Sequence, residues 1–179
     1  MNLLALFCLV IALSIPVASV AGDAVPPAYR SMGIEYGIPP EILYSIALTE
    51  SGKSYRGLRL PWPWTVNHGG KGLYFPSRQA AYDYLSQVLS RGQKNFDVGL
   101  MQVNWRWNAH VFGSLWEALD PYENLRGGAS ILRSHYVRLG SFEDAVGAYH
   151  SPGNASRANA YRERVRGALA GILRQGGRF

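Results

Sequence analysis

Apolar residues recur along most of the chain at the three- and four-residue spacing of helices that bury one face. Many of these stretches are bounded by residues that start or stop helices, such as Ser77, Ser141 and Asp120-Pro121 at the beginning and Gly37 and Gly140 at the end. The predicted helices cover residues 28–36, 40–51, 77–89, a short stretch from 114, 121–138, 141–149 and 156–174. The chain is therefore expected to be mainly α-helical.

One region, residues 53–76, departs from the helical pattern. Its segment PWPWTVNHGGKGLYF has aromatic and β-branched residues on both sides of a glycine-rich stretch, His68–Gly72, which predicts a β-hairpin. Residues 97–104 are expected to be extended or turning. Because strands and helices do not alternate as in a doubly wound sheet, we expect a single mainly α domain with one small β-hairpin.

The N-terminus has the pattern of a secretory signal peptide. Residues 3–13 are an unbroken apolar stretch, and Ser19-Val20-Ala21 is a small-x-small cleavage site. No Lys or Arg precedes the apolar stretch, which leaves a retained membrane anchor as the alternative. We expect residues 1–21 to be the signal peptide and residues 22–179 the domain, which then contains no cysteine because Cys8 is the only one.

Charge and motif content narrow the function classes. The net charge of +6 favours an anionic partner, such as nucleic acid, anionic lipid or the bacterial cell wall. The basic residues are scattered, so a nucleic-acid surface is not indicated. The four histidines lack the spacing of metal ligands, and neither H-E-x-x-H nor G-x-S-x-G occurs. We therefore expect no metal, no cofactor and no serine nucleophile.

Among the carboxylates, Glu50 has the most informative position. It follows the apolar face of a predicted helix and precedes Gly52, so a place between core and cleft would desolvate it and raise its pKa. A protonated carboxyl of this kind can donate a proton to a glycosidic oxygen; the alternative is a surface glutamate at a frayed helix end. Ordinary glycosidases need a second carboxylate, for which Asp97 is the one serious candidate.

Four short motifs occur in a fixed order along the chain: Glu50-Ser51, Gly99-Leu100-Met101-Gln102 followed by Val-Asn, Ala148-Tyr149-His150, and Tyr161 in the final helix. This order resembles the soluble lytic transglycosylase family, the lysozyme-like family 1, over nearly all of residues 28–175. The short layout resembles the small members attached to conjugation and type IV secretion systems. The resemblance implies a lysozyme-like fold.

The resemblance also implies roles for these residues. Glu50 would be the catalytic acid, Ser51 would orient that carboxylate or the sugar, and Gly99 would let the backbone approach the substrate. Leu100, Met101 and Gln102 would form the substrate-binding segment, with Met101 contacting a sugar face and Gln102 an N-acetyl group. Tyr149 would hydrogen-bond to Glu50, and Tyr161 would support the cleft wall. His150 stands where the family usually has Asn, and unlike Asn it titrates near neutral pH.

The implied reaction cleaves the bond between N-acetylmuramic acid (MurNAc) and N-acetylglucosamine (GlcNAc) of peptidoglycan, leaving 1,6-anhydroMurNAc ends. It needs one carboxylate, so the lack of a clear second one favours it. We expect a monomer in the periplasm, acting on glycan strands, with no nucleic-acid partner and with a conjugation or secretion complex as a candidate partner. The alternatives are a hydrolase resembling goose-type lysozyme, in which Asp97 places a water, and a non-catalytic wall-binding module. Trp62, Trp64 and Tyr74 of the hairpin are expected either to wall the cleft or bind glycan, or to pack against one another as a structural flap.

Overall fold

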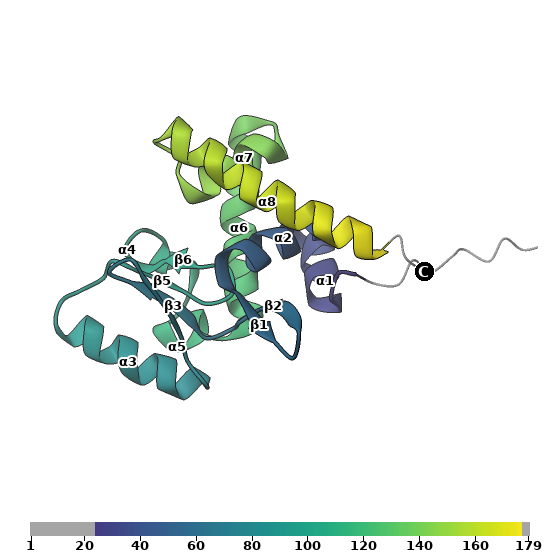
Figure 1. The fold of residues 1–179 in the computed structure, drawn as a ribbon. Coiled ribbons are helices and arrows are strands. Elements are labelled where there is room, and N and C mark those ends of the chain that lie inside the picture. Colours follow the sequence, from purple (N-terminus) through teal and green to yellow (C-terminus); the bar gives the residue numbers. More distant parts are fainter. Residues whose placement is uncertain (1–23, 177–179) are drawn as a thin grey trace, which may run out of the picture.

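Residues 24–176 are described by the structure, a computed structural model, and the signal peptide predicted for residues 1–21 lies outside them. This part of the chain is mainly helical, as predicted, with the elements arranged as in Figure 1. Its helices are α1 (Pro27–Tyr36), α2 (Pro40–Ser51), α3 (Arg78–Ser90), α4 (Trp105–Asn108), η1 (Ala109–Val111), α5 (Leu115–Ala118), α6 (Pro121–Leu139), α7 (Phe142–His150) and α8 (Ala155–Gly176).

The strands are more numerous than the one predicted hairpin. They are β1 (Gly52–Tyr55), β2 (Leu58–Pro61), β3 (Thr65–His68), β4 (Lys71–Tyr74), β5 (Phe96–Val98) and β6 (Val103–Asn104). The predicted hairpin is β3–β4, and β5 and β6 extend it to an antiparallel sheet of order β4-β3-β5-β6. A second hairpin, β1–β2, directly follows α2.

Local side-chain chemistry explains where the helices begin and end. Ser77 accepts a hydrogen bond from the backbone N–H of Ala80 at the start of α3, and Asp120 caps α6 in the same way. Gly37 and Gly140 end α1 and α6 in the left-handed conformation, with φ of 60° and 74°. These capping residues are all visible in the sequence, which is why the helix boundaries agree with the prediction.

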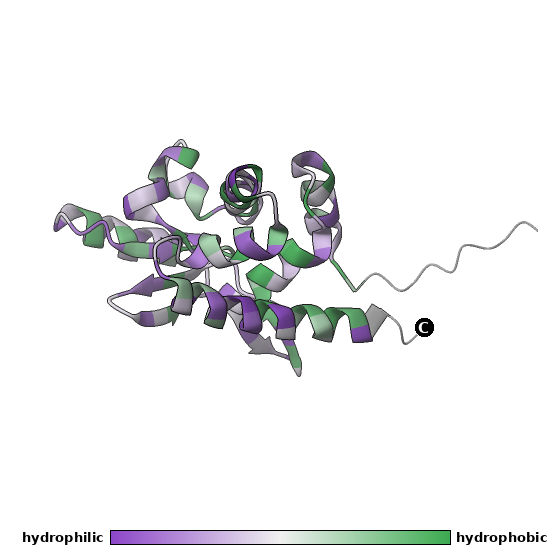
Figure 2. Cartoon of the chain, turned by 90° about the horizontal axis from the view of Figure 1, so that it is seen from above, coloured by the Kyte–Doolittle hydropathy of each residue, from purple (hydrophilic) through white to green (hydrophobic). Residues whose placement is uncertain are grey.

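Buried side chains form two hydrophobic cores. The first lies among α1, α2, α6, α7 and α8, and the second lies between the larger sheet and helices α3 and α5. Val98 belongs to the second core and Leu100 to the first, so the chain passes from one core to the other at Gly99. Along α8, polar and apolar residues occur side by side in Figure 2, and its residues Tyr161 and Val165 are buried in the first core.

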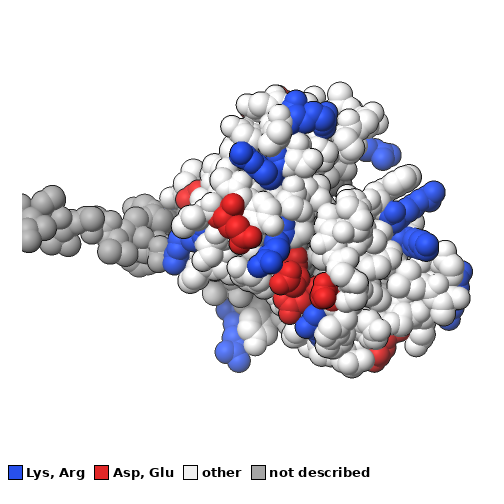
Figure 3. Space-filling view, turned by 180° about the vertical axis from the view of Figure 1, so that it is seen from behind, with Lys and Arg blue, Asp and Glu red and all other residues white. Residues whose placement is uncertain are grey.

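The surface bears many separate charges. On the face shown in Figure 3, Lys and Arg side chains are spread among other residues rather than gathered in one continuous patch. Within residues 24–176, no helix has the length and apolar character needed to cross a membrane.

Candidate active site

A cleft of about 670 Å³ is lined by residues from both halves of the molecule. The helical half contributes Glu50 from α2, residues of α6, and Tyr149 and His150 from the end of α7. The sheet contributes polar residues of β3, β5 and β6, and α4 contributes Trp107. Three of the four segments that the motifs singled out therefore have residues in one cleft.

The Glu50 carboxyl group lies at the end of α2, with only 15% of its side chain exposed. Burial raises its pKa from the usual 4.5 to about 7. The negative charge of Asp97 adds to this rise, whereas the Tyr161 hydroxyl and the Arg164 cation oppose it. Near neutral pH the carboxyl group therefore occurs in both protonated and ionised forms, which suits a group that donates a proton in one step and accepts one in the next.

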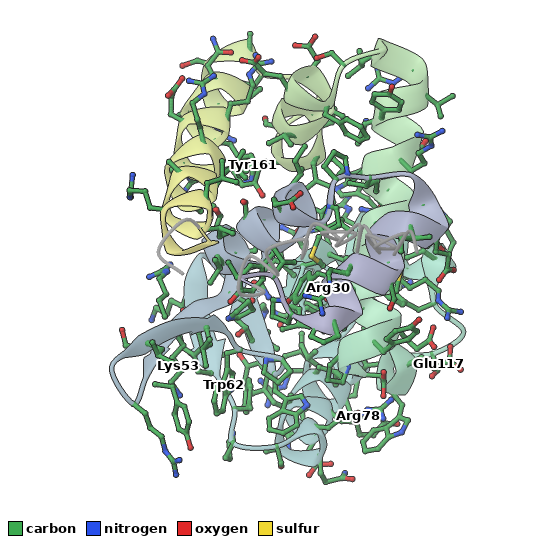
Figure 4. All side chains as sticks on the ribbon, turned by 90° about the vertical axis from the view of Figure 1, so that its right-hand side faces the viewer. Arg30, Lys53, Trp62, Arg78, Glu117 and Tyr161 are labelled. Atoms are coloured by element: carbon green, nitrogen blue, oxygen red, sulfur yellow. The ribbon has the colours of Figure 1, made fainter. Side chains whose placement is uncertain are left out.

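An aromatic pair lies beside Glu50. Tyr161 projects from α8 toward the interior of the molecule (Figure 4), and its buried ring stacks on His150 with centroids 4.5 Å apart and planes 2° from parallel. The His150 Nδ1 atom lies 4.0 Å from Glu50 Oε1. Burial and the cations Arg164 and Arg157 lower the pKa of His150, which favours the neutral imidazole at neutral pH.

The Tyr161 hydroxyl is a polar group for which the sequence suggested only a supporting role. It makes no hydrogen bond of ordinary geometry among the described residues, yet it is close enough to Glu50 to lower the pKa of that carboxyl. Tyr161 is thus the tyrosine that interacts with the candidate acid.

The predicted hydrogen bond from Tyr149 to Glu50 is wrong. The Tyr149 hydroxyl donates instead to the backbone carbonyl oxygen of Met101, at 2.8 Å. Burial, followed by the charges of Glu50 and Asp97, raises the pKa of Tyr149 well above its usual value, so the hydroxyl stays protonated and remains a donor. Tyr149 therefore fixes the Gly99–Gln102 segment while its side chain lines the cleft.

Ser51 and Gly99 support the site without facing a ligand. Ser51 is fully buried, and the single hydrogen of its hydroxyl is shared between two carbonyl oxygens, that of Leu100 at 2.7 Å and that of Ala47 at 3.0 Å. Gly99 has φ of +82°, and a Cβ atom there would lie only 2.2 Å from Asn124 Nδ2. Ser51 was expected to orient the Glu50 carboxylate or the sugar, but its hydrogen-bond partners are backbone carbonyls. Gly99 was expected to let the backbone approach the substrate, but the close approach that requires glycine there is to Asn124.

Asn124, which the sequence analysis did not single out, holds the same segment from the other side. Its side chain is fully buried, accepts from the backbone N–H of Met101 at 2.8 Å, and donates to the carbonyls of Val98 and Ala118, each at 2.9 Å. The sequence feature that could have identified Asn124 is that it is a polar residue on the face of α6 that is buried. Together, Ser51, Tyr149 and Asn124 fix the backbone of the Gly99–Gln102 segment.

Leu100 and Met101 are core residues rather than cleft residues. Both are buried in the first core, and Met101 has no exposed surface, so the predicted contact of Met101 with a sugar is wrong. Gln102 does line the cleft, as predicted. Its amide nitrogen donates to the backbone carbonyls of Thr65 and Gly99, at 2.9 and 2.8 Å, so the side-chain carbonyl oxygen is the atom left for an N-acetyl N–H.

A row of polar side chains crosses the sheet on the cleft side. Asn67, Asp97 and Asn104 are in register on β3, β5 and β6, and all three line the cleft, whereas the valines next to them in sequence are buried. Asn104 donates to Asp97 Oδ1 at 2.7 Å. Burial raises the pKa of Asp97, and hydrogen bonds from the Asn104 and Asn67 amides oppose the rise. The cleft therefore contains a second carboxylate, which removes the argument that a single carboxylate favours a transglycosylase.

The aromatic residues of the hairpin region divide between the two expected roles. Trp62 donates from Nε1 to the Phe75 carbonyl at 2.7 Å, and Lys53 lies beside it in Figure 4, with Nζ 4.3 Å from its ring centroid. Trp64 packs against the second core. These two tryptophans therefore form a structural flap, whereas Tyr74 lines the cleft.

Comparison with known protein families identifies the family of the chain. Residues 77–168, more than half of the chain, match the transglycosylase SLT domain. Glu50 and Ser51 lie before the matched segment in the sequence, and strands β1–β4 lie between them and its first residue. No curated protein and no solved structure matched the chain. Within residues 24–176, no three His, Cys, Asp or Glu residues lie close enough to hold a metal ion. The chain belongs to the transglycosylase SLT domain family, the lytic transglycosylases that bind peptidoglycan.

Proposed function

We propose that the protein cleaves the β-1,4 bond between MurNAc and GlcNAc as a lytic transglycosylase, with Glu50 as its acid and base. The main support for the proposal is that the Glu50 carboxyl group is largely buried, has a pKa of about 7 and lies in the cleft of an SLT-family fold. At neutral pH, a substantial fraction of such groups holds the proton that the leaving oxygen needs.

The reaction divides into two steps. Glu50 donates its proton to the glycosidic oxygen, and the bond from this oxygen to C1 of MurNAc breaks while the N-acetyl oxygen bonds to C1. The C6 hydroxyl of the same sugar then attacks C1, the N-acetyl oxygen departs, and Glu50 takes the hydroxyl proton. No water is consumed, and Glu50 returns to its protonated state.

The role of Glu50 is tested by the release of soluble fragments from purified peptidoglycan. Glu50→Gln is expected to lose release by at least about 100-fold, because general acid catalysis contributes roughly 10²–10⁴-fold. The control is Glu41→Gln, in the first turn of the same helix, which is expected to retain activity. Undiminished release by Glu50→Gln would contradict the proposal. A Glu50→Gln protein that still performs its cellular role would instead favour a wall-binding module.

A hydrolase is the second candidate, because Asp97 faces the same cleft as Glu50. In that case the Asp97 carboxylate would act as base toward a water or as nucleophile. Asp97→Asn would then abolish cleavage. Under the transglycosylase proposal, Asp97→Asn weakens substrate binding and lowers the pKa of Glu50, but it leaves a measurable rate and anhydro products.

We further propose that residues 1–21 direct export to the periplasm and that the enzyme acts as a monomer beside a conjugation or secretion complex. The support is the apolar segment with its Ser19-Val20-Ala21 site and the resemblance of the short layout to small transglycosylases of those systems. N-terminal sequencing of the protein recovered from the periplasm would test the first part, with Gly22 expected as the first residue. Recovery of the uncleaved chain in the membrane fraction would contradict it.

A further inference from the structure

One aromatic side chain at the cleft is not explained by packing. Trp107, in α4, is 69% exposed, which makes it the most exposed aromatic residue among residues 24–176. It lines the same cleft as Glu50. Single exposed apolar side chains are common on protein surfaces, so the feature that distinguishes Trp107 is the combination of its exposure with its position in the wall of the Glu50 cleft.

The packing of Trp105, the first residue of α4, shows how this helix is oriented. Trp105 stacks on Phe96 of the second core, with centroids 6.0 Å apart and planes 9° from parallel. Successive residues are about 100° apart around a helix, so Trp107 lies on the side of α4 that faces away from this core. The Arg106 guanidinium lies 4.9 Å from the Trp107 ring centroid and covers one face of the indole.

Next to this indole, the cleft wall offers hydrogen-bond acceptors. Asn104 directly precedes α4, and it holds Asp97 through its amide nitrogen, so the amide oxygen points elsewhere. The Oδ1 atoms of Asn104 and Asn67 are themselves buried, so they do not face the cleft as acceptors, whereas the Asp97 carboxylate that Asn104 holds belongs to a residue that lines it. An exposed indole beside a cleft-lining carboxylate suits a ring with a flat C–H face and hydroxyl groups at its edge, as a pyranose sugar has.

We infer that Trp107 is the stacking platform of a sugar subsite, where it binds one pyranose ring of the glycan strand while the Asp97 carboxylate accepts a hydrogen bond from a sugar hydroxyl. The inference rests on the proposed function, because it takes the glycan of peptidoglycan as the ligand. Trp107 is a binding residue here and takes no part in proton transfer. Its loss therefore raises KM and leaves kcat nearly unchanged.

The test measures binding in a Glu50→Gln protein, which holds the glycan without cleaving it. The probe is peptide-free glycan strands prepared from purified peptidoglycan. Trp107→Ala in this background is expected to raise Kd about tenfold, equal to ~1.4 kcal/mol, whereas Trp107→Phe keeps an aromatic face and raises Kd less than about threefold. The matched control is Ile34→Ala, an 83% exposed apolar residue on α1 that does not line the cleft, and it keeps the parent Kd.

Tryptophan fluorescence gives a second readout. Glycan binding should shift the emission of the Glu50→Gln protein to shorter wavelength, and Trp107→Phe should lose most of this shift while still binding. An unchanged Kd in Trp107→Ala, a Kd in Trp107→Phe as high as in Trp107→Ala, or no glycan binding by the parent would overturn the inference. If the wild-type protein cleaves peptidoglycan but Trp107→Ala binds normally, the proposed function stands and the subsite fails. If it does not cleave but binding depends on Trp107, the proposed function fails and the subsite stands.

Discussion

Replacing Glu50 by Gln should stabilise the folded protein at alkaline pH and have little effect on its stability at acid pH. Burial raises the pKa of this carboxyl from 4.5 to about 7 in the folded state. Between these pH values the folded chain binds more protons than the unfolded chain, so the free energy of unfolding falls as the pH rises. Glutamine keeps the shape of the protonated carboxyl group and does not titrate.

The structure sets the size of this effect. The difference between 4.5 and about 7 corresponds to about 3 kcal/mol at pH 8, because one pKa unit is ~1.4 kcal/mol. With 15% of the side chain exposed, solvent screens the carboxylate only slightly. At pH 4 both states are largely protonated, and the wild type and the variant should differ by less than about 1 kcal/mol.

Urea unfolding of both proteins at pH 4.5 and pH 8 measures the effect. The quantity to compare is the gain from Glu50→Gln at pH 8 minus the gain at pH 4.5, since other titrating groups largely cancel in it. Glu35→Gln, at an exposed position on α1, is the matched control and should give a difference near zero. A difference near zero for Glu50→Gln as well would show that Glu50 titrates as an ordinary surface carboxylate, and the account of its acidity would be refuted.

Three other substitutions test the surroundings of Glu50. Tyr161→Phe removes a hydroxyl that lowers the Glu50 pKa. The alkaline limb of the kcat/KM profile should therefore move to higher pH by up to about one pH unit, with little loss of stability. A shift to lower pH would contradict this role of Tyr161. Gly99→Ala combines a φ of +82° with a contact to Asn124, and it should lower the free energy of unfolding by more than about 3 kcal/mol in urea; a loss below about 1 kcal/mol would show that the segment adapts. Ser51→Ala leaves the Leu100 carbonyl without its donor and should cost about 1–3 kcal/mol, whereas an unchanged urea midpoint would show that this bond contributes nothing.

The helices and the identity of the candidate acid could be predicted from sequence because their signals are local. Ser77 and Asp120 cap the first turns of α3 and α6, and Gly37 and Gly140 end α1 and α6, so each boundary is marked by a residue that lies at it in the sequence. The β1–β2 hairpin was missed because its turn, Arg56-Gly57, has no Asn-Gly or Asp-Gly pair. Both of its central residues nevertheless adopt positive φ, 50° and 80°.

The composition of the cleft could not be predicted, because it depends on long-range pairing. The row of Asn67, Asp97 and Asn104 exists only because β3 pairs with β5 and β5 with β6. A one-residue change in either register would turn these side chains away from the cleft. The resemblance selected four segments, three of which have residues in one cleft, but it misjudged how some of their residues act. Met101 is a buried core residue, and Ser51 is buried and holds the Leu100 carbonyl.

The most direct test of the single-acid reaction is a mass spectrum of the fragments released from peptidoglycan in water enriched in heavy oxygen. If Glu50 acts alone, the MurNAc ends are lighter than reducing ends by one water and free of the heavy isotope, and they are absent from the Glu50→Gln digest. Reducing ends that carry the heavy isotope would contradict the single-acid reaction, since they would show that water attacks C1 and that the enzyme is a hydrolase.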